Sequence, residues 1–147
     1  MLRTTGVLLG AVLASALVTL GCASESQALR RSAPKLELKP CGKEKVVHGE
    51  GYDAAARECI WKAYLARDAA EFTTTHVTIE GDPIAYTIQI KPDVVVTVDN
   101  QDRYGQKGVS THTCQAMERI RQEKQPERFG FALTGCVGGG MTRLAVP

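Results

Sequence analysis

The fold of this chain is decided by residues 84–99, which read Ile-Ala-Tyr-Thr-Ile-Gln-Ile-Lys-Pro-Asp-Val-Val-Val-Thr-Val-Asp. An apolar side chain stands at every second position, first at Ile84, Tyr86, Ile88 and Ile90 and then at Val94, Val96 and Val98. Residues two apart in a strand point to the same face of a sheet, and Pro-Asp is typical of a turn. The stretch therefore predicts two antiparallel strands that share one apolar face.

The residues before this stretch predict a third strand and a helix. Residues 74–80 alternate in the same way, and Gly-Asp-Pro at 81–83 predicts the turn that follows them. Residues 51–71 change to the helical period, with Asp53 suited to cap the first turn. Small and apolar residues fall on one arc of that helix, at Tyr52, Ala56, Cys59, Ile60, Ala63, Ala66 and Ala70. We expect this arc to cover the apolar face of the sheet.

Two further strands are predicted after the polar segment 100–108. One spans residues 109–117 and the other residues 129–136, with the charged segment 118–128 as an exposed connection. If residue 114 faces residue 136 in an antiparallel pair, residue 118 faces residue 132. The predicted fold class is α+β, with one N-terminal helix packed on an antiparallel sheet of about five strands. Its domain spans residues 41–137, and residues 138–147 are expected to form a flexible tail.

The N-terminal segment 1–22 has the features of a secretion signal. Residues 6–20 form an apolar run of fifteen residues, short of the ~20 that a membrane-spanning helix needs. Gly21-Cys22 ends the run like a bacterial lipobox, which makes Cys22 the predicted lipidation site. Thr19 and Leu20 depart from the usual lipobox, so ordinary cleavage near Ala23 is the alternative, and an uncleaved anchor is less favoured than either. Residues 23–40 are polar and predict a tether.

The cysteine count fits an exported protein. If one of the five cysteines carries lipid, four remain to form disulfides. In an oxidising compartment these four predict two disulfides, and they are Cys41, Cys59, Cys114 and Cys136. Three pairings are possible, and we favour Cys41–Cys59 with Cys114–Cys136. No Cys-x-x-Cys occurs, which argues against zinc and thioredoxin-like chemistry.

The composition and motifs argue against several classes of function. The net charge is +2, whereas a nucleic-acid binder needs a concentrated basic patch, so we expect no nucleic-acid partner. His48, His76 and His112 lack metal-ligand spacing, and the residues after Asp99 do not match a calcium loop. We expect no metal and no cofactor, and we assign no catalytic residue.

Polar residues in two predicted loops are the candidate binding surface. In an up-down-up meander, the first and third strands end on the same side, which would bring the loops after residues 80 and 99 together. The predicted surface patch consists of Glu80, Asp82, Asp102, Arg103 and Tyr104. The alternative is that each loop is an independent turn, with its Asp side chain capping backbone amides.

Four segments resemble a family of small bacterial lipoproteins catalogued as domain of unknown function 4362. They are Thr-Ile-Glu-Gly-Asp-Pro-Ile at 78–84, Asp-Arg-Tyr-Gly at 102–105, Ser-Thr-His-Thr-Cys at 110–114 and Leu-Thr-Gly-Cys at 133–136. The resemblance covers about residues 72–136. It implies a helix with such a sheet and a late cysteine pair, which supports Cys114–Cys136, while the pair Cys41–Cys59 departs from the family pattern. It implies no activity.

These observations predict a lipid-anchored protein of the cell envelope that binds a partner and is not an enzyme. The membrane would hold it through the anchor, and its partner would be an unknown protein or small ligand of the envelope. The alternative function is a small envelope enzyme or a divalent-ion-binding module that uses the acidic loop residues. The alternative location is a soluble periplasmic or secreted one.

Overall fold

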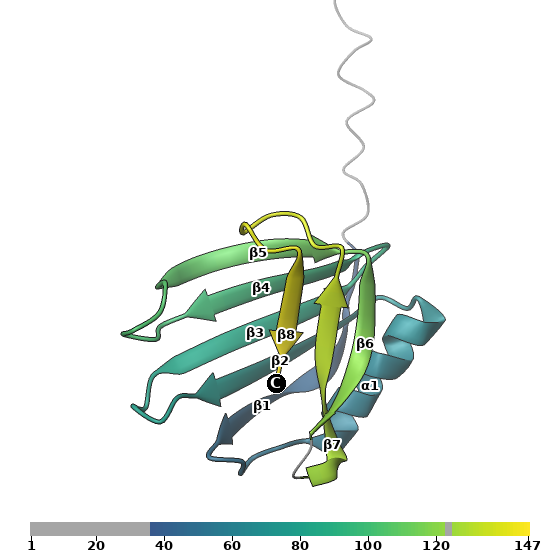
Figure 1. Cartoon of the computed structure of the whole chain (residues 1–147). Helices are drawn as coiled ribbons and strands as arrows, with labels where there is room; N and C mark the ends of the chain where they lie inside the picture. The colour runs from purple at the N-terminus through teal and green to yellow at the C-terminus, as the bar shows by residue number, and fades with distance from the viewer. Residues whose placement is uncertain (1–35, 123–124) are drawn as a thin grey trace, which may run out of the picture. The chain divides into compact units, whose positions relative to one another are not determined.

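The computed structural model describes residues 36–122 and 125–147, which form two sheets and one helix (Figure 1). The elements in chain order are β1 (Lys39–Val47), α1 (Ala54–Ala66), β2 (Ala70–Val77), β3 (Pro83–Ile90), β4 (Val94–Asn100), β5 (Gly108–Cys114), β6 (Ala116–Gln122), β7 (Gln125–Thr134) and β8 (Arg143–Val146). The first sheet has the order β1-β2-β3-β4-β5 and the second the order β6-β7-β8. None of the described helices is long and apolar enough to cross a membrane.

The predicted meander is confirmed. Strands β2, β3, β4 and β5 pair antiparallel in sequence order, and the register places Phe72, Ile88 and Val96 side by side on the same face. All three side chains are fully buried. The alternation at 84–98 therefore identified the core face correctly.

The sheet is mixed, which corrects the prediction of a purely antiparallel one. Strand β1 starts in the last two residues of the predicted tether and continues through residues 41–47, for which no strand was predicted. It runs parallel to β2 with Lys39 opposite Ala70. Helix α1 forms the crossover that two parallel neighbours require. Lys43 and Lys45 give β1 a polar pattern, as is common on edge strands, which is why its sequence does not resemble a core strand.

Helix α1 is shorter than the predicted span 51–71. The Asp53 side chain accepts a hydrogen bond from the Ala56 N–H, which confirms the predicted N-cap. The helix ends because Arg67 adopts a left-handed conformation, with φ 58° and ψ 32°. Ala70, expected on the helical arc, instead begins β2 and is fully buried.

The C-terminal third forms a second sheet, so the expectations of one sheet and of a flexible tail were wrong. The described residues of segment 118–128 are largely exposed, as predicted, but they form strands instead of a connection. Gln115 separates β5 from β6, and the predicted connection 118–128 supplies most of β6 and the start of β7. Glu118 lies opposite Ala132, the predicted register. The predicted tail contains β8, which pairs with β7 and buries Leu144 and Val146. Four residues are too short a strand for periodicity to reveal.

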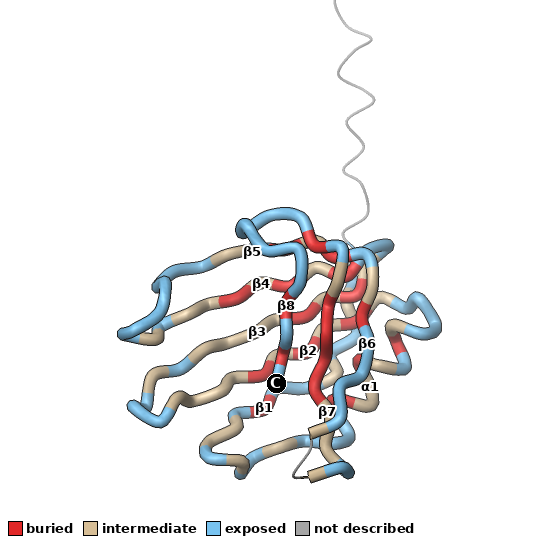
Figure 2. Tube along the Cα trace, in the orientation of Figure 1, coloured by how far each residue is buried: buried red, intermediate tan, exposed pale blue. Residues whose placement is uncertain are grey.

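One hydrophobic core joins α1 and both sheets. Ile60 of α1, Phe72 and Val96 of the first sheet, and Phe131 and Val146 of the second belong to the same buried cluster. Figure 2 shows buried residues gathered where β7 faces the first sheet, whereas the loops at the left end of that sheet are exposed. The second sheet and the helix thus cover one face of the first sheet, and the loops at the left lie beyond this cover.

Candidate functional site

Two disulfides staple the domain, in the favoured pairing. Cys41 of β1 is bonded to Cys59 of α1, and Cys114 of β5 is bonded to Cys136 after β7. Such bonds persist in oxidising compartments, which places the domain outside the cytoplasm. The predicted lipidation site Cys22, the signal 1–22 and most of the tether lie outside the described residues.

The two candidate loops meet at one end of the first sheet. Residues 78–82 connect β2 to β3 and residues 101–107 connect β4 to β5, and we call them together the loop tip. The Arg103 guanidinium donates to both carboxylate oxygens of Asp82, with Nε–Oδ2 2.7 Å and Nη2–Oδ1 2.9 Å. Its Nη2 also donates to the main-chain oxygen of Glu80 at 3.2 Å. The structure thus brings Glu80, Asp82 and Arg103 together as one clamp.

Hydrogen bonds hold Asp82 ionised. Donation from the Arg103 side chain, followed by donation from the Arg103 backbone N–H at 3.0 Å, lowers the pKa of the Asp82 carboxyl to about 2. The same contact raises the pKa of Arg103. Because both charges are engaged with each other, the clamp positions the loops and is poorly suited to proton transfer.

Each loop is also ordered by its own hydrogen bonds. The Thr78 hydroxyl accepts from the Asp82 N–H at 3.1 Å. The Asp102 carboxylate accepts from the Tyr104 N–H at 2.9 Å, and Asn100 Oδ1 accepts from the Asp102 N–H at 2.9 Å. The alternative prediction, that Asp side chains cap backbone amides within each loop, is therefore also met, and the clamp between the two loops is present as well.

The clamp leaves two large apolar side chains projecting into solvent. Tyr104 of the predicted patch is 79% exposed and Ile79 is 86% exposed. The sequence did not predict that Ile79 belongs to the exposed patch, because its alternation with Val77 predicted a strand position. Strand β2 ends at Val77, and the turn from the Thr78 N–H to the Asp82 main-chain oxygen takes Ile79 out of the sheet.

The sequence also did not predict a buried polar cluster beneath α1. Arg57 is fully buried, and its Nε donates to Glu44 of β1 at 2.8 Å. Its Nη1 donates to the Phe129 oxygen at 2.7 Å and its Nη2 to the Pro147 oxygen at 2.6 Å. Burial and then the Arg57 charge lower the pKa of nearby His76. Arg57 connects α1 to β1, β7 and the residue after β8, so its role is structural.

The three histidines lie apart. Within residues 36–122 and 125–147, no three His, Cys, Asp or Glu side chains converge as ligands for a metal ion. His112 is fully buried beneath Gly139, and its Nε2 lies 3.0 Å from the Ser110 hydroxyl.

Comparisons of the chain with models of known protein families, with curated proteins and with solved structures found no match.

Proposed function

We propose that this protein is a membrane-tethered binding module of the cell envelope, which presents the loop tip to a protein partner. The observation that carries the proposal is the exposure of Ile79 and Tyr104 on loops that Arg103 and Asp82 clamp together. Tyrosine is enriched among the few residues that carry most of the binding energy of protein interfaces, and a surface that is ordered before binding loses less conformational freedom when it binds.

The two loops are fixed before a partner binds, which favours a role in recognising that partner. A loop that is fixed before association loses less conformational freedom on binding. The bidentate contact between Arg103 and Asp82 joins two loops that are separated by a whole hairpin, and the internal turns restrict each of them. This arrangement suits a rigid contact surface that docks without rearrangement.

The position of the tip in the fold also favours this function. Strand β1 begins at Lys39, opposite Ala70, at the end of the sheet where β2 starts. The tip lies at the other end, where β2 and β4 finish. A tether that joins the domain before β1 would therefore leave the tip pointing away from its attachment point.

The experiment compares capture of envelope proteins by four forms of the full chain: wild type, Ile79→Ser, Tyr104→Ser and a matched control, Leu65→Ser. Leu65 is 63% exposed on α1, so its substitution removes a similar apolar surface away from the tip. We expect a partner that wild type and the Leu65 variant retain and that each tip variant binds at least fivefold more weakly. Capture of no protein, or equal loss in all three variants, contradicts the proposal.

The anchor has its own measurement. Mass spectrometry of the mature N-terminus should show a diacylglyceryl group on Cys22. A mature chain that begins with an unmodified residue near Ala23 would contradict the anchor and leave the tip proposal standing.

A further inference from the structure

Strand β5 differs from the other edge strands because it carries no charged side chain. The edges of the two sheets are formed by β1, β5, β6 and β8. Among these described strands, β1 contains three lysines, β6 contains two arginines and a glutamate, and β8 contains an arginine, whereas β5 reads Gly-Val-Ser-Thr-His-Thr-Cys. Charged side chains on an edge strand hinder its pairing with another strand. The edge of β5 therefore lacks the protection that the other edges have.

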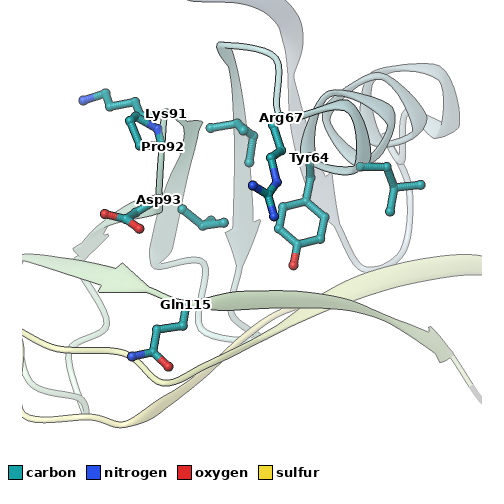
Figure 3. Close-up of a pocket in the computed structure, with 9 residues that line it drawn as sticks. Tyr64, Arg67, Lys91, Pro92, Asp93 and Gln115 are labelled. Atoms are coloured by element: carbon teal, nitrogen blue, oxygen red, sulfur yellow. The ribbon is translucent and has the colours of Figure 1, made fainter.

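The C-terminal end of this edge is already paired within the chain. The Thr113 N–H donates to the Val137 oxygen at 3.0 Å, and the Val137 N–H donates to the Thr113 oxygen at 2.9 Å, in antiparallel geometry. Figure 3 shows Gln115 where β5 passes into β6, and its N–H donates to the Thr134 oxygen at 3.1 Å. The edge of β5 thus accepts a strand-like partner, and Val137 fills only its last part.

The N-terminal end of the same edge is open. Main-chain groups of alternate residues in an antiparallel strand point to the same side, so those of Val109 and Thr111 point away from β4 as those of Thr113 do. Gly138 lies against the Thr111 oxygen, because a Cβ there would be 2.5 Å from it. No described main-chain group bonds to the Thr111 N–H or to Val109 on this side. Figure 1 shows the segment after β7 passing beside one end of β5 and leaving the end near the loop tip uncovered.

We propose that the open edge of β5 takes up an extended segment of the protein partner, which joins the first sheet as an antiparallel strand. This inference rests on the proposed function, because the open edge begins at Gly108, directly after the loop tip that contacts the partner. The segment would exchange hydrogen bonds with Val109 and accept one from the Thr111 N–H. Val109 and Val137 are 69% and 67% exposed on the same face, so the segment would carry apolar or β-branched side chains there.

A second copy of the chain is a poorer occupant of this edge. If two β5 strands pair about a two-fold axis with Val109 of each opposite Thr111 of the other, residue 107 of each lies opposite Thr113 of the other. Val137 already occupies that place, and the clamp fixes the loop that contains residue 107. A segment of another protein can end or turn before it reaches Val137.

The test selects ligands for the full-length mature protein from a display library of random linear peptides and measures their affinity by isothermal titration. We expect the selected peptides to bind saturably and to slow the amide hydrogen exchange of Val109 and Thr111. N-methylation of the peptide residues that face β5 should weaken binding by about tenfold or more, whereas N-methylation of the intervening residues should not. A library that yields no peptide protecting these two amides overturns the proposal, as does equal sensitivity to both sets of N-methyl groups.

Two variants at one position separate the main chain from the side chain. Thr111→Pro removes the N–H on the open side, where an edge strand tolerates proline, and should weaken the selected peptides by about tenfold or more. Thr111→Val keeps the N–H, so affinity that falls equally in both variants would assign binding to the hydroxyl group and contradict the proposal. If the proline variant melts early, the N-methylated peptides decide on wild-type protein.

The outcome also separates this inference from the proposed function. Peptides that bind the β5 edge as expected, while Ile79→Ser and Tyr104→Ser capture envelope proteins as wild type does, would contradict the role of the tip and support strand addition. Capture that depends on the tip, with no peptide bound at the β5 edge, would support the tip and overturn strand addition.

Discussion

Replacing Arg57 with methionine should destabilise the domain by about 4 kcal/mol, within the ~3–5 kcal/mol range for removing one partner of a buried ion pair. The Arg57 and Glu44 side chains are 0% and 1% exposed, so the substitution leaves the Glu44 carboxylate buried without its counter-charge. It also removes the donors to the Phe129 and Pro147 oxygens. For a domain of this size, the melting temperature should fall by on the order of 15 °C.

Denaturant titration at pH 7 with both disulfides intact measures this loss. The matched variant is Glu44→Leu combined with Arg57→Met, which removes both charges and fills the site with apolar volume. The double variant should recover at least half of the lost stability, because apolar replacement of both partners avoids the unpaired charge. A single variant that loses less than about 1 kcal/mol, or a double variant no more stable than the single one, would refute the reasoning.

Three other predictions concern pH and covalent bonds. The pKa of Asp82 is 3.8 in the unfolded chain and about 2 in the folded one, so the clamp between Asp82 and Arg103 stabilises the fold fully above pH 3.8. This stabilisation should be lost as the pH falls through about 2, and amide hydrogen exchange in both loops should then become faster. The pKa of His76 is lowered in the folded state, so stability should fall as pH decreases below 6.5, and His76→Asn should flatten this dependence in denaturant titrations. Replacing Cys41 and Cys59 together with serine should cost about 3 kcal/mol of unfolding free energy.

Sequence patterns within short segments predicted the strands of the meander, the start of the helix and the disulfides. Alternation at 84–98 identified the meander, because a half-buried strand must place apolar residues at every second position. Asp53 indicated the start of α1, because its side chain satisfies a backbone N–H within the first turn. Cysteine count and spacing favoured the two disulfides that the structure contains. Strands β1 and β8 escaped prediction, since one is a lysine-rich edge and the other spans four residues.

The sequence by itself determined the helix, the meander and the shared end of the two candidate loops, because periodicity and strand direction dictate each of them. The cysteine count limited the two disulfides to three pairings, and the structure decided between these pairings. Tertiary structure alone decided that Arg103 reaches Asp82, that Arg57 is buried against Glu44, and that β6–β8 leave the first sheet. These contacts join residues far apart in the chain, and their geometry follows from packing that no local pattern encodes.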